Sequence, residues 1–513
     1  MTRRSFIGFA AQCASVGLIS SPHRANGDFL ADRADSEWIR LGAVEMGSLL
    51  RLKEISPVEL VEAHIAQFAG IQRATNAATH TPFAAALRAA RAAERAILNG
   101  EVDWQSQPLF GLPFSVKNHI DVAGIPTTAA VRGWKYRIAT SDADVVDQLR
   151  RGGAISFCTT NLPCLAFAYD TNNSLFGRTN NPYDIARSAG GSSGGEGALV
   201  AACGSPLGVG SDHNGSIRVP CAWNGLAGLR PTPERISLRG MHPQELIAPQ
   251  AWSIGPIARR VRDLEIALPF FFDNRAAAKL LPLSDSRRID LKGLRIAYLT
   301  KWSQASSVPT RDIQNAVAKS IKLLEQNNAS IVGELPASFY RIGRATLGAM
   351  LGKDQFAIDG FRNTIKTFGC EDDGVLQDVL GWIQHYQTSV SIEQQRDDAN
   401  EFSQLQKQFA GFMDDVDAII LPVHAHPAML HGTVWPYEQS ERSEDKYSYC
   451  YFCLLSGRYP AGTVRVDVTT EGLPIGVQII GREYRDDIVL RVMAELEAAF
   501  GGWQPPANTT ESR

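Results

Sequence analysis

Two short segments rich in glycine and serine lie close together near the middle of this sequence. The first is residues 190–195 (GGSSGG), and the second is residues 210–216 (GSDHNGS). An apolar run at residues 198–209 separates them, and we expect this run to be buried. Since glycine allows a backbone to approach other atoms closely or to take positive φ, the pattern predicts two loops around one site. A flexible Gly/Ser linker would lack the apolar run.

Three kinds of site use loops of this composition. A phosphate-binding loop ends in lysine followed by serine or threonine, and neither segment is followed by lysine. A nucleophile elbow, G-x-S-x-G, matches residues 191–195 with Ser193 at its centre. The histidine that an elbow needs would come from His242, His385, His424, His426 or His431. The third kind is a serine activated by lysine in place of histidine, and it fits this sequence best.

The motifs of this third kind resemble those of the amidase signature hydrolases. That family places a lysine after a Gly-x-Pro strand, as in residues 111–117 (GLPFSVK). It combines a GGSSGG segment with a later Gly-Ser-x-Arg-x-Pro segment, as in residues 215–220 (GSIRVP). Its triad is a lysine, a cis-serine and a nucleophilic serine, which match Lys117, Ser192 and Ser216 here. The resemblance extends from about residue 41 to residues 472–478 (GLPIGVQ).

The resemblance implies a route for the protons. Neutral Lys117 is expected to take a proton from Ser192, which takes one from Ser216, and Ser216 then attacks the amide carbonyl to form an acyl-enzyme. Because burial disfavours a charged lysine, we expect Lys117, which ends an apolar run, to have a lowered pKa. The expected oxyanion hole consists of the backbone N–H groups of His213, Asn214, Gly215 and Ser216. The expected supporting residues are Ser193, Asp212 and Arg218.

Three positions depart from the family pattern. Asn118 follows the lysine where aspartate is usual, and residues 127–130 (TTAA) replace the usual Thr-Thr-x-Gly/Ser. Asn214 stands where a glycine normally precedes the Gly-Ser pair. None of the three removes a triad residue. Since asparagine tolerates the left-handed backbone region, we expect Asn214 to keep a glycine-like turn and to add a polar side chain that restricts the acyl group.

Helix-like and strand-like segments alternate along the chain. The helix-like segments include residues 85–98, 142–151, 311–327 and 486–500, and the strand-like ones include residues 109–116, 154–159, 294–299 and 418–421. Such alternation predicts an α/β fold. With the resemblance, it implies one large amidase signature domain, residues 26–513, with a central mixed β-sheet layered between helices. Residues 339–441 match the family weakly, and we expect them to shape the substrate pocket.

The N-terminus resembles a twin-arginine export signal. Arg3 and Arg4 precede an apolar run that ends at Ile19, and the small residue Ala25 follows. We therefore expect residues 1–25 to be a signal peptide and the mature protein to be periplasmic. The apolar run is too short for a stable membrane anchor. Cleavage would also remove one of the eight cysteines, and the odd number that is left does not form a complete disulfide framework.

Two other patterns are weak candidates for metal sites. His424 and His426 alternate along a strand end, but no cluster of carboxylates or cysteines accompanies them. Cys450 and Cys453 form a C-x-x-C motif without a second pair. We therefore expect neither a metal nor a cofactor.

These observations together predict an amidase that hydrolyses the C–N bond of a linear carboxylic amide, with a small-molecule amide as its partner. The net charge of -3 gives no bias toward nucleic acid, and we expect no such partner. Homodimer formation stays open. One alternative function is a catalytically weak amide-binding protein, which the intact triad opposes. Another is an amidotransferase-type subunit that supplies ammonia from glutamine, which an export signal opposes because the tRNA partner is cytoplasmic.

Overall fold

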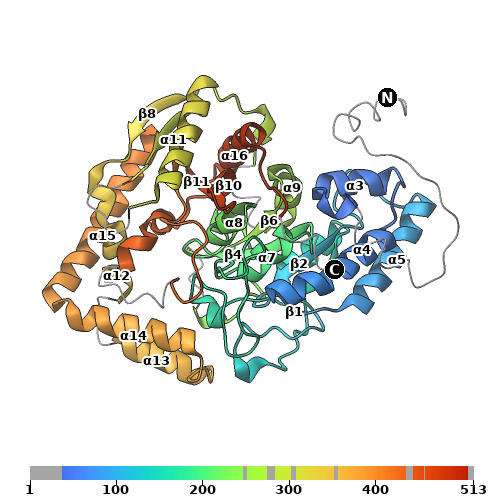
Figure 1. Cartoon of the computed structure of the whole chain (residues 1–513), viewed down its shortest axis with the longest axis horizontal. Helices are drawn as coiled ribbons and strands as arrows, with labels where there is room; N and C mark the ends of the chain where they lie inside the picture. Colours follow the sequence, from blue (N-terminus) through green and yellow to red (C-terminus); the bar gives the residue numbers. More distant parts are fainter. Residues whose placement is uncertain are drawn as a thin grey trace.

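A sheet of eleven strands runs through the molecule, and helices lie against both of its faces (Figure 1). The computed structural model describes residues 37–246, 251–273, 283–301, 308–351, 356–434, 443–455 and 457–506. The predicted signal peptide, residues 1–25, lies outside these described residues. The prediction of an α/β fold with a central mixed sheet between helices is confirmed.

The strands of this sheet run in both directions. In spatial order they are β1 (Ala78–His80), β3 (Ile155–Thr160), β2 (Pro113–Lys117), β4 (Leu207–Asp212), β6 (Ser253–Ala258), β5 (Ala227–Arg230), β10 (Ala461–Val468), β11 (Pro474–Gly481), β9 (Ala418–Pro422), β7 (Arg295–Tyr298) and β8 (Ser330–Glu334). Strand β2 is parallel to β3 and β4, and β7 is parallel to β8 and β9. The other neighbours are antiparallel, so two parallel sections are joined through antiparallel strands.

Helices of very different length surround the sheet. The α-helices are α3 (Ala43–Arg51), α4 (Pro57–Thr75), α5 (Phe83–Asn99), α6 (Asp144–Arg151), α7 (Gly194–Ala201), α8 (Arg218–Trp223), α9 (Val261–Ala267), α11 (Arg311–Gln326), α12 (Ile342–Leu351), α13 (Phe356–Thr367), α14 (Gly374–Ser389), α15 (Ile392–Asp415) and α16 (Asp486–Phe500). The 3-10 helices are η1 (Glu37–Arg40), η2 (Arg132–Trp134), η3 (Cys164–Ala166), η4 (Pro233–Arg235), η5 (Gln244–Leu246), η6 (Leu268–Phe270), η7 (Ser286–Arg288), η8 (Ala337–Arg341) and η9 (Ser443–Leu454). Among the described residues, none of these helices has the length and apolar character needed to cross a bilayer.

Local sequence signals explain several of the boundaries. Helix α5 consists largely of strong helix formers and ends before Gly100, which takes φ +73 as the left-handed cap. Helix α16 has the predicted bounds. The strand expected at residues 109–116 begins only at Pro113, because Gly111 takes φ +81 and the Leu112 N–H bonds back to Leu109 in a turn.

Neighbouring residues of the central strands point into different cores. In β9, Ile420 belongs to a cluster with α9, α11 and α16, whereas Ile419 and Leu421 belong to a cluster with α8, α12, α15 and η9. Since successive residues of a strand face opposite sides, both faces of this part of the sheet are buried.

The sheet also brings the end of β2 close to the two glycine- and serine-rich segments. Lys117 is the last residue of β2, Ser211 lies at the end of β4, and these strands are parallel neighbours. The carboxyl ends of parallel strands lie at the same edge of a sheet. Helix α7 begins at Gly194, directly after Ser192 and Ser193, and packs against β2 and β4. Both glycine- and serine-rich segments therefore meet at the end of β2.

Candidate active site

Lys117 and Ser192 are in direct contact at the end of β2. Lys117 Nζ lies 2.7 Å from Ser192 Oγ and 3.0 Å from Ser211 Oγ. All three side chains are fully buried. The peptide bond between Gly191 and Ser192 is cis, which is the configuration that the family resemblance implies for this serine. Two of the three residues expected to form a triad are thus within hydrogen-bond distance.

Ser216 belongs to the same cluster of loops. The Ser193 N–H donates to the Ser216 carbonyl oxygen at 3.1 Å, and the Ser193 hydroxyl donates to the Ser211 carbonyl oxygen at 3.2 Å. Ser193 therefore ties the two segments together, which fits the supporting role expected for it. Ser216 is 7% exposed, whereas Lys117 and Ser192 are fully buried, so Ser216 is the member of the set that solvent reaches.

Close packing explains two of the glycines in these segments. A Cβ at Gly195 would lie 2.4 Å from the backbone nitrogen of Asn161, which follows β3. A Cβ at Gly215 would lie 2.7 Å from Cys450 Sγ, and Gly215 also takes φ +107, which favours glycine. The two positions let α7 and the Ser216 loop approach their neighbours closely.

Asp212 and Arg218 form a buried ion pair behind the Ser216 loop. Arg218 Nη2 lies 2.9 Å from Asp212 Oδ1, and Arg218 Nε lies 3.0 Å from Asp212 Oδ2. Arg218 also donates to the side chain of Gln478 in β11. Burial acts to raise the pKa of Asp212, but the Arg218 guanidinium outweighs it and holds that pKa below its usual range. This arrangement fits the expected bracing role, since it fixes the loop against the sheet.

The ion pair also corrects the expected oxyanion hole. The Gly215 N–H donates to Asp212 Oδ1 at 2.7 Å, so this donor is already occupied by an ionised carboxylate. The inclusion of Gly215 among the free donors was therefore wrong. Within the described part of the chain, the N–H groups of His213, Asn214 and Ser216 make no hydrogen bond and stay available as donors.

Asn214 does not take the left-handed conformation that we expected. Among the described non-glycine residues with positive φ, Asn214 is absent, and the left-handed residue of this loop is Gly215. The expectation was wrong because the adjacent glycine makes the turn. The Asn214 carbonyl oxygen instead accepts a hydrogen bond from the Tyr169 hydroxyl. Its side-chain Oδ1 is buried and has no hydrogen-bond partner among the described residues.

The surroundings of Lys117 favour its neutral form. Burial lowers the pKa of Lys117 to about 7, although the carboxyl groups of Asp212 and Glu196 act in the opposite direction. The hydroxyl groups of Ser115 and Thr160 lie 2.5 Å and 2.7 Å from the Glu196 carboxyl oxygens. Burial raises the pKa of Glu196 to about 8 in spite of these contacts, so this carboxyl group is mostly uncharged at pH 7. A substantial fraction of Lys117 is therefore neutral at that pH.

Known proteins match this chain over nearly its whole length. The family model named Amidase covers residues 59–490. The chain belongs to the amidase signature family. An acylamidase from Rhodococcus erythropolis is 31% identical over 478 residues, which cover 89% of this chain and 95% of the relative. Fatty-acid amide hydrolase 2-A from Danio rerio is 28% identical over 494 residues, which cover 92% of this chain and 90% of the relative.

Solved structures agree with the fold of this amidase signature protein. A structure described as fatty acid amide hydrolase superposes with a TM-score of 0.77 over 95% of this chain and 92% of its own, at 22% identity. The family match and the amide-hydrolysing relatives place this protein among hydrolases that act on amides.

The contacts of Ser193 do not favour the nucleophile elbow in this amidase signature protein. Its hydroxyl donates to a backbone carbonyl instead of to an imidazole. Of the histidines proposed for an elbow, His242 pairs with Asp121 (2.7 Å between Nε2 and Oδ2), and His385 is exposed on α14. His431 Nε2 lies 3.1 Å from the Ile185 carbonyl oxygen.

The two weak metal candidates have other contacts. His424 Nδ1 accepts a hydrogen bond from the His426 N–H at 3.0 Å. Cys450 and Cys453 are buried, and Cys453 Sγ lies 3.5 Å from Arg218 Nη1. In the residues that the structure describes, no group of three or more His, Cys, Asp or Glu side chains is placed to hold a metal ion.

Sequence reasoning missed three polar residues beside the predicted set. Ser211 contacts Lys117, and His119 Nε2 lies 2.8 Å from Ser211 Oγ. Tyr169 holds the carbonyl of Asn214. The only signals available were that His119 lies two positions after Lys117 and that Ser211 belongs to the second glycine- and serine-rich segment. Nothing in the sequence marks Tyr169.

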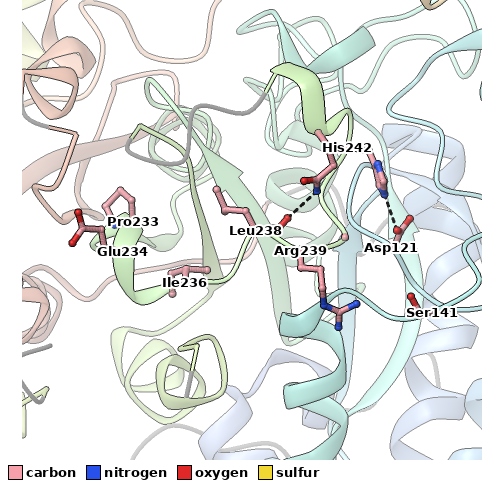
Figure 2. A pocket seen from close by; sticks show the side chains of 10 residues that line it. Asp121, Ser141, Pro233, Glu234, Ile236, Leu238, Arg239 and His242 are labelled. Carbon is pink, nitrogen blue, oxygen red and sulfur yellow. Dashed lines mark hydrogen bonds and ion pairs between the residues drawn. The ribbon is translucent and has the colours of Figure 1, made fainter. Parts of the chain in front are cut away.

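A cavity of about 780 Å³ lies near this site without including its serines. Figure 2 shows Asp121, Ser141 and His242 on one side of the cavity, and Pro233 and Glu234 on the other. The His242 carbonyl oxygen lies 3.2 Å from His119 Nδ1, so His119 connects the cavity wall with Ser211. The lining includes the Ser141 hydroxyl, but His242 Nε2 contacts Asp121 and Arg137, and no hydrogen bond among the described residues joins Ser141 to that histidine.

Proposed function

We propose that this protein is an amidase that hydrolyses the C–N bond of a linear carboxylic amide through an acyl-enzyme on Ser216. The observation that carries the proposal is the buried 2.7 Å contact between Lys117 Nζ and Ser192 Oγ, beside the loop of Ser216. The names of the relatives, an acylamidase and a fatty-acid amide hydrolase, support an acyl amide as the substrate class.

The first half of the proposed reaction forms an ester. A serine hydroxyl is a weak nucleophile at neutral pH, so it needs a base within hydrogen-bond reach. Neutral Lys117 takes the Ser192 proton while Ser192 takes the proton of Ser216. The Ser216 oxygen attacks the carbonyl carbon, and the oxyanion that forms accepts hydrogen bonds from free N–H groups of the His213 to Ser216 loop. Each such donor is worth about 3 kcal/mol in other hydrolases.

The second half releases both products. Ser192 passes a proton to the leaving nitrogen, the C–N bond breaks, and the amine departs. Water then attacks the ester, with Lys117 and Ser192 again taking its proton. Collapse of the second tetrahedral species returns the proton to Ser216 and frees the carboxylic acid.

Replacement of the nucleophile tests the proposal. Ser216→Ala should abolish both turnover of acyl amides and covalent labelling by a fluorophosphonate. Ser192→Ala should keep the fold and react much more slowly, because it loses the relay and keeps the nucleophile. Thermal melting of each variant checks the fold. Full activity in Ser216→Ala would refute the assignment.

The two alternative functions make different predictions. A catalytically weak amide-binding protein would bind amides and resist fluorophosphonate labelling. An amidotransferase-type subunit would co-purify with partner subunits and release ammonia from glutamine. We favour hydrolysis because a lysine with a lowered pKa has no purpose in simple binding.

We also infer that the precursor is exported to the periplasm. The support is the pair Arg3 and Arg4 ahead of a short apolar run, since an arginine pair is the address that the twin-arginine export route reads.

A further inference from the structure

His119 is a buried histidine beside the candidate base, and its protonation state can be assigned from its contacts. His119 is 2% exposed, and burial keeps the pKa of its ring well below the usual range, with a further lowering from Lys117 whenever that lysine is charged. The ring is therefore neutral at neutral pH. Nδ1 lies 3.2 Å from the His242 carbonyl oxygen, which can only accept a hydrogen bond. Nδ1 therefore carries the proton, and Nε2 has the lone pair.

The assignment of His119 fixes the direction of the next hydrogen bond. Ser211 Oγ lies 2.8 Å from His119 Nε2, so the Ser211 hydroxyl donates its only proton to that nitrogen. Lys117 Nζ lies 3.0 Å from the same oxygen. Since the Ser211 proton is used, Lys117 must donate to Ser211.

A neutral lysine has two N–H bonds and one lone pair. Donation of one N–H to Ser211 leaves the lone pair free to face Ser192 Oγ, 2.7 Å away. Without an acceptor at His119, the Ser211 hydroxyl could turn and donate to Lys117 itself. The lone pair would then be divided between two serines, and only Ser192 leads to the nucleophile.

We propose that His119 is a positioning residue for the reaction, which accepts the Ser211 proton and thereby directs the lone pair of Lys117 to Ser192. The inference rests on the proposed function of Lys117 as the base. His119 touches neither the reacting atoms nor the nucleophile, and it acts through Ser211. The charged and titratable groups around Lys117 are Asp212 and Glu196, and His242 lies behind His119.

Two substitutions at position 119 separate the effect of the hydrogen-bond acceptor from the effect of the ring shape. His119→Phe keeps a ring of similar size and removes the acceptor, whereas His119→Gln keeps an acceptor near the position of Nε2. We expect His119→Phe to lower the plateau kcat by about ten- to hundredfold and to change KM by less than about twofold, because no substrate contact is lost. His119→Gln should regain most of the lost kcat.

The pH profile distinguishes positioning from a general disturbance of the site. In His119→Phe, Ser211 can donate to neutral Lys117 and stabilise it, so the acid limb of kcat should move to lower pH. If the substitution only admitted water, the pKa of Lys117 would rise toward its ordinary value, and the limb would move to higher pH. A shift to higher pH, or an unchanged plateau, would overturn the proposal.

A double-mutant cycle tests the route through Ser211. Since His119 acts through that hydroxyl, His119→Phe with Ser211→Ala should be no slower than Ser211→Ala alone. Additive losses would overturn the proposal.

Lys117→Ala is measured in parallel. If it retains turnover, the proposed function is wrong, whereas an inactive Lys117→Ala with a fully active His119→Phe would contradict the role of His119 alone.

Discussion

At the scale of a single residue, the proposed role of Lys117 as the base predicts how activity depends on pH. Only the neutral amine can take a proton, and burial lowers the pKa of Lys117 to about 7. We expect kcat for an acyl amide to rise as pH increases through about 7 and then to level off. Reagents that modify histidine should have little effect, because the proposed base is a lysine and His119, which contacts Ser211, is buried. The measurement is a kcat profile against pH, and a flat profile that collapses on histidine modification would favour the elbow centred on Ser193.

The same pKa shift predicts how stability changes with pH. The folded pKa of Lys117 lies below its unfolded value of 10.5, so burial destabilises the fold fully below about pH 7. This free-energy cost of burying Lys117 decreases as pH rises toward the unfolded pKa. Lys117→Met should thus raise the free energy of unfolding by about 5 kcal/mol near pH 6 and by about 2 kcal/mol near pH 9. Urea unfolding at the two pH values measures this difference, and an equal gain at both would contradict it.

Asn214 is the residue at which we expect the substrate range to be set. Its side chain lies in the loop that carries Ser216, and its Oδ1 is buried with no hydrogen-bond partner among the described residues. We expect Asn214→Gly to raise kcat/KM for long acyl amides relative to short ones by about fivefold or more, because space is gained at the acyl position.

A matched control separates the effect of the Asn214 side chain from the effect of the loop conformation. Tyr169→Phe removes the hydroxyl that holds the Asn214 carbonyl and leaves the Asn214 side chain in place. It should lower kcat/KM for short and long amides alike. If Asn214→Gly also lowers kcat/KM for short and long amides by the same factor, Asn214 shapes the loop and does not select the acyl group.

At the scale of elements, the helical pair α13 and α14 packs against two segments, residues 129–131 and 162–165. Figure 1 shows the pair at one edge of the molecule, and a turn that contains Cys370 joins the two helices. Cys370 Sγ lies 3.4 Å from Cys164 Sγ in η3, and both thiols are buried. Nearby, Arg132 pairs with Asp372 at 2.9 Å. A bond between these thiols would link the helical pair covalently to η3, which follows β3 in the chain.

We expect the oxidant diamide to link Cys164 and Cys370 in a disulfide. The two thiols lose two electrons and two protons, and diamide takes up both to become the hydrazine. The link should stabilise the fold by about 2–4 kcal/mol, because it closes a long loop of the unfolded chain. Peptide mapping under non-reducing conditions detects the joined peptides, and Cys164→Ser is the control. Free alkylation of both thiols after diamide treatment would contradict the prediction.

Across the whole molecule, the features that the sequence predicts are those with a local cause. Helix α16 follows from its helix formers and strand β9 from its apolar run. The spacing of the family motifs predicts the triad of Lys117, Ser192 and Ser216, and the structure places Lys117 and Ser192 in contact. The order of the eleven strands and the contacts of His119 and Tyr169 have no local signal, because they depend on which loops meet after folding. The same reason explains the errors at Gly215 and Asn214, since composition alone does not show that Asp212 occupies one N–H or that Gly215 makes the turn.

We expect the destination of the whole chain to depend on residues that lie outside the described part of the structure. If Arg3 and Arg4 form a twin-arginine address, replacing both with lysine keeps the charge and removes the signal. The double variant Arg3→Lys with Arg4→Lys should therefore stay in the cytoplasm as an uncleaved precursor. Arg33→Lys, the same change beyond the expected cleavage site, should be exported normally.

The measurement is amidase activity and mass of the protein in cytoplasmic and periplasmic fractions. Because this route carries folded proteins, the retained precursor should be active, which distinguishes a lost address from misfolding. An undiminished periplasmic fraction for the double variant would show that residues 1–25 are not read in this way.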